Sequence, residues 1–350
     1  MKALILVGGK GTRLQPLTYA VPKPMVPMMN RPFLEYMITW LRRHGVDEVI
    51  LTMGYLPESI RGYFHEGQDL GVRLTYVVED QPLDTGGAIK NCEALLQEPF
   101  LVVNGDILTD LDLQGLFRLH RESGALVTVA ASRVEDPTPF GMLDTAPDGR
   151  ILRWVEKPHP EQVTSHHVNV GVFLLQPEAL AMMPPPPFNL ERQFLAPAIA
   201  HGQPVYGYRT ECYWIDIGTV PKYRQAHLDV LSRRIQVPMP GRQAAPGVWV
   251  AADSQVHPRA RLIPPVVLGT SCRVGEGATV GPHTVLCDGV VVEPGATASG
   301  SVVWPGAVLG AGCRLVDCVV GVGCQVAAGA QHADQALAEE PPPGEVNECK

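Results

Sequence analysis

The chain has 350 residues, against roughly 150 for a common single domain, so two domains are expected. Hydrophobic residues make up 45% and charged residues 18%, which excludes general disorder and is enough for a substantial core. The net charge of −8 leaves no broad basic face for a nucleic-acid backbone, so any nucleotide bound here is expected to be a small molecule. Collagen is excluded, and the 35 Gly and 33 Pro must mark turns, linkers or a repeat.

Short apolar runs alternate with amphipathic stretches through the first 130 residues or so. This alternation predicts an α/β domain, with a Rossmann-like, mostly parallel mixed sheet and helices on both faces. Sheets of this kind bind ligands at the carboxyl ends of their strands. The domain is expected to span 1–236, with a last helix near 219–234. The expected strands are 2–7, 48–53, 73–78, 100–104 and 125–131, and the expected helices are 33–44, 57–65, 86–97 and 112–122.

A six-residue repeat follows the stretch 237–247, whose three Pro and two Gly predict a linker. Eleven of the thirteen residues at this spacing are large and apolar, which predicts a left-handed hexapeptide β-helix over 248–330, with roughly four coils. A loose β-sandwich is the alternative, but its strands recur every 8–12 residues without strict phase. Residues 331–350 are expected to form a disordered tail. The repeat positions are Val250, Val256, Leu262, Leu268, Val274, Val280, Leu286, Val292, Ala298, Trp304, Gly310, Val316 and Val322.

The eight cysteines form no CxxC pair and no metal-binding spacing. Five of them lie in the glycine-rich repeat, where small buried thiols fit, so a reduced, cytoplasmic protein is expected. No apolar run approaches 18 residues, and no membrane partner is expected. The apolar stretch 3–7 is too short for a signal peptide and is expected to be the first buried strand.

A glycine-rich loop directly follows this first strand. Gly8, Gly9 and Gly11 let the backbone approach a ligand closely, and successive N–H groups in such a loop can surround a phosphate. The spacing fits neither the Walker motif nor GxGxxG, and many tight turns are rich in glycine without binding anything. Two nearby cations favour a ligand, because Arg13 follows the loop and three prolines stiffen the segment that carries Lys23.

The run GGKGTRLQPLTYAVPKPMVP resembles the opening motif of the sugar-phosphate nucleotidylyltransferases. Further motifs of that family follow in order along the chain, and a C-terminal hexapeptide β-helix is also a family feature. Within the family, length and layout are most similar to the mannose-1-phosphate guanylyltransferases. The motifs are Asn104-Gly105-Asp106, Phe140-Gly141-Met142, Glu156-Lys157-Pro158, Asn169-Val170-Gly171 and Trp214-Ile215-Asp216-Ile217-Gly218-Thr219.

The resemblance implies transfer of a nucleotidyl group from a nucleoside triphosphate to a sugar 1-phosphate, with release of pyrophosphate. Such chemistry depends mainly on positioning and on electrostatic stabilisation. Arg13 would meet the leaving phosphates, and Lys23 would contact the phosphates at the reacting centre. The implied nucleotide-binding residues are Leu6, Gly8, Gly9, Gly11, Thr12, Glu79, Pro82, Thr85 and Gly86. The implied sugar-phosphate-binding residues are Asn104, Gly141, Glu156, Lys157 and Asn169.

Two aspartates, Asp106 and Asp216, would by the same resemblance hold the cofactor Mg²⁺. Magnesium takes few protein carboxylates and several phosphate oxygens, so two Asp from distant segments suit it. The alternative is that both are ordinary turn or cap residues.

The segment 79–88 matches the base-reading loop of the family, and its first residue favours GTP. Guanine presents two adjacent donors, which the carboxylate of Glu79 can accept together, whereas uracil and thymine present a donor beside an acceptor. A water molecule or a backbone group could read the base instead. Asp84 stands where relatives commonly have Gly, and Asp tolerates a positive φ better than most residues. A glucose-1-phosphate thymidylyl-, uridylyl- or adenylyltransferase is the alternative.

Two other functions compete with this one. A hexapeptide acyltransferase needs a His base, but His257 and His283 lie at different phases of the repeat with no acidic partner, so both are expected on the surface. A regulatory subunit would bind a sugar nucleotide without turnover, but such paralogues usually lose the charged residues that this chain keeps. The β-helix is expected to support a homo-oligomer.

Overall fold

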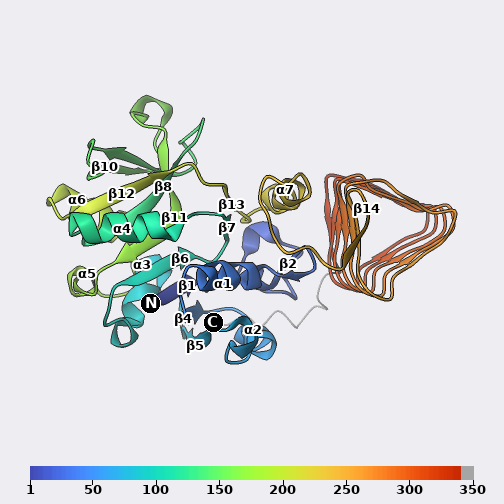
Figure 1. Cartoon of the computed structure of the whole chain (residues 1–350), viewed down its shortest axis with the longest axis horizontal. Coiled ribbons are helices and arrows are strands. Elements are labelled where there is room, and N and C mark those ends of the chain that lie inside the picture. Colours follow the sequence, from blue (N-terminus) through green and yellow to red (C-terminus); the bar gives the residue numbers. More distant parts are fainter. Residues whose placement is uncertain (340–350) are drawn as a thin grey trace. The chain divides into compact units, whose positions relative to one another are not determined.

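The computed structural model describes residues 1–339, which form two compact units (Figure 1). The first unit consists of Met1–Gly9 and Leu34–Trp214, and the second of Lys10–Phe33 and the chain from Ile215 onward. The glycine-rich loop is therefore divided, with Gly8 and Gly9 in the first unit and Gly11 in the second.

The first unit contains a nine-stranded mixed sheet, with β10-β9-β11-β6-β1-β4-β5 as its main path and β8 and β12 beyond β11. Strand β1 runs parallel to β4 and β6 on its two sides, whereas β11 runs antiparallel to β6. The predicted mixed α/β class is confirmed. The strands of this sheet are β1 Lys2–Leu6, β4 Glu48–Met53, β5 Arg73–Val78, β6 Phe100–Asn104, β8 Val127–Arg133, β9 Gly141–Thr145, β10 Ile151–Glu156, β11 His167–Leu175 and β12 Val205–Thr210, and the short β7 Ile107–Thr109 lies outside it.

Helices alternate with the first strands of this unit, as the sequence predicts. Local signals set their ends: the side chain of Asp112 accepts a hydrogen bond from the Gln114 N–H at the start of α4, and Gly124 ends that helix with φ = 61°. Strand β7 is an element that the apolar pattern did not indicate. The helices are α1 Phe33–Arg43, α2 Pro57–Phe64, α3 Asp84–Asn91, α4 Leu113–Ser123, α5 Glu178–Met182 and α6 Ala196–Ala200, with a π-helix at Leu190–Leu195.

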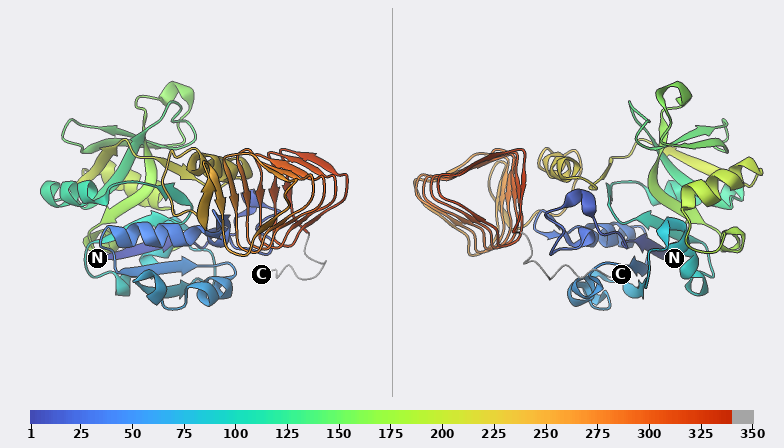
Figure 2. Two further views of the ribbon diagram at one scale, coloured as in Figure 1. Left: turned by 45° about the vertical axis from the view of Figure 1, so that its right-hand side comes forward. Right: turned by 180° about the vertical axis from the view of Figure 1, so that it is seen from behind.

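The second unit holds three sheets of short parallel strands, which wind into coils of triangular cross-section (Figures 1 and 2). This architecture fits the left-handed β-helix that the repeat predicts. The sheet orders are β14-β15-β18-β21-β24-β27-β30, β16-β19-β22-β25-β28 and β17-β20-β23-β26-β29. The remaining elements of the unit are the two-stranded hairpin of β2 Pro27–Met28 and β3 Arg31–Pro32, the strand β13 Trp214–Asp216 that begins it, and the helix α7 Val220–Leu231.

The strands of the β-helix are two to four residues long. They are β14 Arg242–Ala245, β15 Val248–Val250, β16 Gln255–Val256, β17 Arg261–Leu262, β18 Val266–Leu268, β19 Arg273–Val274, β20 Thr279–Val280, β21 Thr284–Leu286, β22 Val291–Val292, β23 Thr297–Ser299, β24 Val302–Val303, β25 Val308–Leu309, β26 Arg314–Val316, β27 Val319–Val320, β28 Gln325–Val326, β29 Gln331–Ala333 and β30 Ala336–Leu337.

The six-residue phase holds through Ala298 and then slips. Partner residues on successive coils are 18 apart up to Ala298, as in Val280↔Ala298, but 17 apart beyond it, as in Ala298↔Leu315. The same corner is one residue shorter on two successive coils, after Ala298 and again after Leu315, so the later core positions are one or two residues earlier than predicted. The predicted Trp304, Gly310, Val316 and Val322 are replaced in the core by Val303, Leu309, Leu315 and Val320.

Two predicted boundaries need correction. Part of the predicted linker is the strand β14, which pairs antiparallel with β15. The β-helix also continues past residue 330, since β29 and β30 extend it to Leu337, and each of the two shorter sheets has five strands rather than the expected four or so. Proline fixes φ but does not prevent the neighbouring residues from pairing, so a Pro-rich composition predicted a linker where β14 forms. The remainder of the predicted tail, 340–350, lies outside the described residues.

The seven cysteines among the described residues are free thiols. Those of the β-helix are buried, as expected, at Cys272, Cys287, Cys313, Cys318 and Cys324. Burial raises the pKa of the Cys272 thiol to about 11, so this group is a neutral, inert part of the core. None of the helices within residues 1–339 is long and apolar enough to cross a membrane.

Candidate functional site

The glycine-rich loop leads into the proline-stiffened arm, which we define as Val21–Pro27. Gly11 has φ = 65°, and a Cβ there would lie 3.1 Å from Lys23 Cβ, so glycine is needed both for the turn and for the close approach. The Thr18 hydroxyl donates to the Gly11 carbonyl at 2.9 Å. The loop end and the lysine-bearing arm are thus packed against each other.

Asp216 lies at the end of β13, four residues before the start of α7. Its Oδ1 accepts from the Gly218 N–H at 3.2 Å, and its Oδ2 forms an ion pair with the Lys222 ammonium. A Cβ on Gly218 would lie 2.8 Å from Asp216 Oδ1 and 3.0 Å from Arg13 Nη2. The carboxylate and the Arg13 guanidinium therefore border the same space above Gly218, where only glycine fits.

Glu79 follows β5 in the first unit and lies beside the first glycine of the loop. A Cβ on Gly8 would be 3.6 Å from Glu79 Oε1, and Glu79 Oε2 accepts from the Leu83 N–H at 3.3 Å. Burial raises the pKa of this half-buried carboxyl, since it disfavours the charged form. The carboxylate has acceptor capacity that the Leu83 N–H does not use.

Asp84 begins α3 with φ = 58°, so the position does require the left-handed backbone for which Asp is tolerated. The next residue is committed to packing: Thr85 Oγ1 accepts from the Leu190 N–H at 3.0 Å and donates to Glu191 at 3.4 Å. Gly86 lies against Phe188, whose ring carbon would be 2.1 Å from a Cβ. Thr85 thus anchors the segment 79–88 to the π-helix, and Gly86 packs it against Phe188, which precedes that helix.

The predicted sugar-binding residues come together at the ends of β9, β10 and β11. Gly141 is paired directly with Glu156 across β9 and β10, and a Cβ at Gly141 would lie 2.7 Å from Glu156 Oε2. The Trp154 indole N–H donates to the same oxygen at 3.4 Å. Lys157 follows with φ = 51°, exposed, and its N–H donates to the Phe140 carbonyl at 2.9 Å.

Two amide side chains lie beside Gly171 of β11. Asn169 Oδ1 accepts from the Gly171 N–H at 2.8 Å, and a Cβ on Gly171 would lie 2.8 Å from Asn104 Nδ2. Asn104 ends β6 in register with Leu6 at the end of β1. Carboxylate and amide groups at one sheet edge are suited to the hydroxyls of a polyol.

Asp106 lies in the turn between β6 and β7, at this same edge of the sheet. The preceding Gly105 donates its N–H to the Leu6 carbonyl at 3.0 Å, and a Cβ at Gly105 would lie 2.3 Å from that oxygen. The close packing of the turn against β1 fixes the backbone from which Asp106 projects.

The predicted site residues are divided between the two units. The second unit contains Gly11, Thr12, Arg13, Lys23 and Asp216. The first contains Leu6, Gly8, Gly9, Glu79, Pro82, Thr85, Gly86, Asn104, Asp106, Gly141, Glu156, Lys157 and Asn169. Within the described part of the chain, no three His, Cys, Asp or Glu side chains converge as a metal cluster.

Sequence reasoning missed two charged residues near these groups. Lys222, in the first turn of α7 and six residues after Asp216, neutralises this aspartate, and a basic residue at the start of the last predicted helix was the available signal. Glu191 is 9% exposed on the π-helix, and burial, together with the charge of Glu156, raises its pKa. Glu191 had no signal in the sequence, because only the fold brings it to Thr85.

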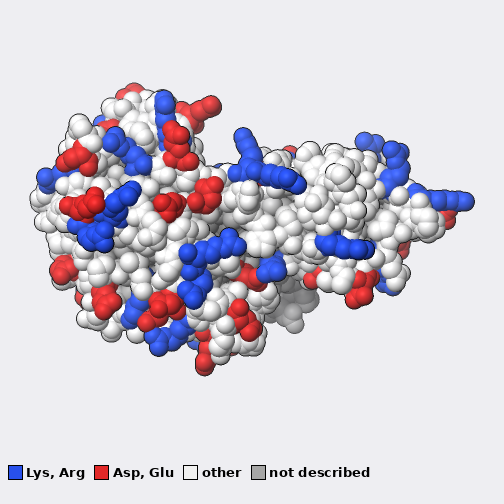
Figure 3. Space-filling model, viewed as in Figure 1, with Lys and Arg blue, Asp and Glu red and all other residues white. Residues whose placement is uncertain are grey.

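The surface and the two histidines of the β-helix are close to expectation. On the face shown in Figure 3 acidic and basic side chains are interspersed rather than gathered into a basic band. His257 is exposed, and its Nδ1 accepts from the Arg259 N–H at 3.2 Å. His283 is partly exposed at a corner with φ = 54°.

The chain belongs to the nucleotidyl transferase family, whose family model matches residues 2–233. This match covers the sheet of the first unit, the glycine-rich loop, the arm and α7. In this chain the matched residues form the mixed α/β sheet and the glycine-rich loop that follows β1.

Relatives of known name extend the similarity into the β-helix. The chain is 34% identical over 316 residues to the UTP–glucose-1-phosphate uridylyltransferase of Synechocystis, covering 84% of this chain and 81% of the relative. It is 35% identical over 301 residues to the mannose-1-phosphate guanylyltransferase of Mycobacterium tuberculosis, with the same coverage. Among solved structures, HddC from Yersinia pseudotuberculosis in complex with GMP-PN has a TM-score of 0.55 at 29% identity, covering 64% of this chain and 97% of HddC.

Proposed function

We propose that the protein joins GTP to mannose 1-phosphate and releases pyrophosphate, giving GDP-mannose. Sugar-phosphate nucleotidylyl transfer is supported by the family match and by relatives that carry names of this type. The choice of guanine as the base and mannose as the sugar goes beyond what these similarities support. The observation that carries the choice of base is Glu79, a half-buried carboxylate beside Gly8.

Guanine suits the free acceptor capacity of Glu79. The N1–H and the exocyclic amine of guanine are adjacent donors, and an ionised carboxylate accepts both. The left-handed conformation of Asp84 supports a base-reading loop of the family's geometry despite the departure from glycine. The complex of HddC with GMP-PN and the mannose-1-phosphate guanylyltransferase relative agree with this choice.

In the proposed reaction a phosphate oxygen of the sugar 1-phosphate attacks the α-phosphorus of GTP. The new P–O bond forms as the bond from the α-phosphorus to the bridging oxygen of pyrophosphate breaks. Arg13 binds the leaving phosphates, and Lys23 screens the two anions from each other. Lys157 holds the sugar phosphate, while Gly141, Glu156, Asn104 and Asn169 orient the sugar hydroxyls.

Mg²⁺ is the proposed cofactor, with Asp106 and Asp216 as its protein ligands. Two carboxylates suit this ion, which fills its other positions with phosphate oxygens and water. When bound, it would neutralise charge on the reacting phosphates. One positive charge of the protein itself already lies beside Asp216, since the Lys222 ammonium forms an ion pair with Oδ2.

A uridylyltransferase acting on glucose 1-phosphate is the second candidate. It is favoured by the 34% identity to the Synechocystis relative. If Glu79 did not contact the base, its carboxylate would give no preference for guanine over uracil.

A pyrophosphate-release assay tests the proposal directly. We expect release with GTP, mannose 1-phosphate and Mg²⁺ to exceed that with UTP, dTTP or ATP, and with glucose 1-phosphate, by at least roughly tenfold in kcat/KM, as expected for one matched pair of hydrogen bonds. A preference for UTP and glucose 1-phosphate would establish the second candidate. Absence of release in every combination would remove the enzymatic function.

A further inference from the structure

Within the second unit, hydrogen bonds connect the β-helix to the segment that carries Lys23. The arm Val21–Pro27 continues into the hairpin of β2 and β3, whose turn residues Met29 and Asn30 have φ of 42° and 72°. Positive φ at both central residues is the geometry of a tight two-residue hairpin turn, and it is unfavourable for a buried Met. Something outside the hairpin must therefore hold the turn.

Asp288, at a corner of the β-helix, supplies that support. Its Oδ1 accepts from Asn30 Nδ2, and its own N–H donates to Asn30 Oδ1 at 2.9 Å. The same Oδ1 accepts from the Thr270 N–H of the previous coil. The space is full, because a Cβ on Gly269 would lie 2.6 Å from Asp288 Oδ1. The turn and two coils are thus joined by a closed pair of hydrogen bonds.

Trp304 makes a second connection. It follows the inward-facing Val303, so it points out of the coil, and its side chain is fully buried against α7. Its indole N–H donates to Tyr223 Oη at 3.0 Å, and the Tyr223 hydroxyl donates to the Pro27 carbonyl. The shortened corner after Ala298 is what turns Trp304 outward, since the strict six-residue phase would place it in the core.

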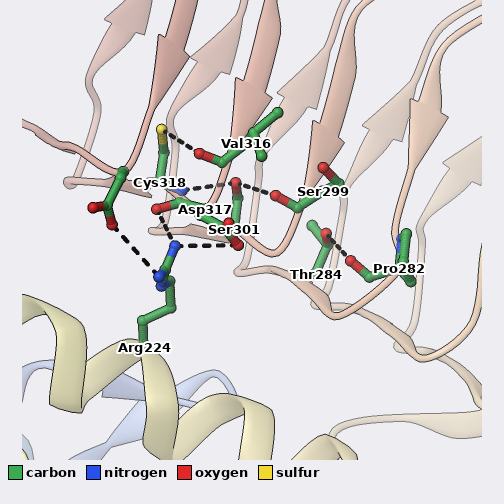
Figure 4. Close-up of polar contacts among 9 residues, drawn as sticks. Arg224, Pro282, Thr284, Ser299, Ser301, Val316, Asp317 and Cys318 are labelled. Carbon is green, nitrogen blue, oxygen red and sulfur yellow. Dashed lines mark hydrogen bonds and ion pairs between the residues drawn. The ribbon is translucent and has the colours of Figure 1, made fainter.

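Arg224 makes a third connection, one residue along α7. Its guanidinium pairs with Asp317 Oδ1 at 3.1 Å and with Asp334 Oδ1 at 3.5 Å, and it also donates to the Asp317 carbonyl (Figure 4). Asp317 and Asp334 occupy the same corner of successive coils, where both have positive φ. Helix α7 begins at Val220, four residues after Asp216, and its Lys222 pairs with the Asp216 carboxylate, so attachment of the helix also supports that ion pair.

We propose that the β-helix positions Lys23, with Asp288 acting through Asn30 and Trp304 acting through Tyr223 as positioning residues. The proposal rests on the proposed function only for the role of Lys23. Pro22, Pro24 and Pro27 leave the arm little freedom, so the anchors at Pro27 and Asn30 are transmitted to Lys23. A displacement of about 1 Å at a reacting centre can lower turnover by about a hundredfold.

The test compares Asp288→Ala, Asp288→Asn and Trp304→Phe with the wild-type full chain. Asp288→Asn keeps an acceptor for Asn30 and Thr270, and Trp304→Phe keeps an aromatic ring but lacks the N–H. The matched control is Arg259→Ala, which removes an exposed ion pair with Glu276 from the same β-helix. Amide hydrogen exchange of 22–33 is measured by mass spectrometry, and kcat and KM are measured with GTP and mannose 1-phosphate.

We expect Asp288→Ala and Trp304→Phe to speed exchange of 22–33 by roughly tenfold and to lower kcat by roughly 10- to 100-fold, with KM for mannose 1-phosphate within about twofold. Asp288→Asn should restore most of the wild-type exchange rate and kcat, and Arg259→Ala should match the wild type in both. Unchanged hydrogen exchange in both Asp288→Ala and Trp304→Phe would overturn the proposal. Faster exchange in these variants would also overturn it if their kcat equalled that of Arg259→Ala. A wild type without pyrophosphate release would overturn the proposed function instead, and exchange in Asp288→Ala would still decide whether the support exists.

Discussion

At the scale of single residues, charge and hydrogen-bond capacity decide what the candidate site can bind. Glu79 is the clearest case, because only one of its oxygens has a backbone donor, from Leu83. Its raised pKa means that the acid limb of GTP binding should lie at higher pH than for an exposed glutamate, since only the ionised form accepts both guanine donors.

Glu79→Gln is expected to lower kcat/KM for GTP by roughly 10- to 100-fold and to raise it for UTP. An amide presents a donor beside an acceptor, which matches uracil and leaves one guanine donor unpaired. Steady-state kinetics with both nucleotides measures the change, and the exposed Glu98→Gln is the control. An unaltered ratio of GTP to UTP would exclude Glu79 from base recognition.

At the scale of elements, glycines in helices have opposite roles in α2 and α3. Gly86 and Gly87 of α3 donate their N–H groups to the Phe188 carbonyl, at 3.0 and 3.1 Å, so this short helix lies directly on the 186–188 segment. A Cβ on Gly62 of α2 would have no neighbour within 4 Å among residues 1–339, apart from adjacent residues and its own helix backbone. The glycines of α3 thus permit specific packing against Phe188, whereas Gly62 only lowers the stability of α2.

Gly86→Ala is expected to lower the free energy of unfolding by roughly 1–3 kcal/mol, because the new methyl group would overlap the Phe188 ring. Gly62→Ala should raise it by roughly 0.4–1 kcal/mol, by restricting the unfolded chain and favouring the helix. Urea unfolding followed by circular dichroism measures both. Equal effects of the two substitutions would contradict the packing described for α3.

At the scale of the whole molecule, each compact unit contains a buried neutral histidine. His120 contacts Thr128 Oγ1 at 2.8 Å and Gln176 Nε2 at 3.0 Å, and burial lowers its pKa to about 4. His227 is 1% exposed, and burial lowers its pKa to about 3 although its Nε2 lies 3.2 Å from the Pro27 carbonyl. Both folded pKa values lie below the ordinary 6.5, so the unfolded chain gains protons that the folded chain does not.

Stability should therefore be fully present above pH 6.5 and fall as the pH drops toward 4. Each histidine contributes a loss of roughly 2 kcal/mol between pH 7 and pH 5. Glu79 and Glu191, with raised pKa values, act in the opposite direction, so the test uses a difference between variants. His120→Gln should reduce the loss by roughly 2 kcal/mol, whereas the exposed His201→Gln should not alter it. Urea unfolding at pH 7, 6 and 5 measures this, and parallel pH dependence in all three proteins would refute it.

The sequence by itself determined the α/β sheet, the β-helix and the motifs of the candidate site. Strands such as Lys2–Leu6 and Glu48–Met53 are strongly apolar, and Gly11 and Gly141 are needed where their Cβ atoms would clash, so these signals are local. The conformation at Asp84 is local as well, since its positive φ is one that Asp tolerates better than most residues.

Only the tertiary structure decided how distant residues meet. The slip in the repeat after Ala298 depends on the length of one corner, which a strict period cannot register, and it changes Trp304 from a predicted core residue into a contact of Tyr223. The pairing of Asn30 with Asp288 joins positions 258 residues apart. Propensity and periodicity act over a few residues, whereas such contacts form only when the folded backbone brings two segments into hydrogen-bond distance.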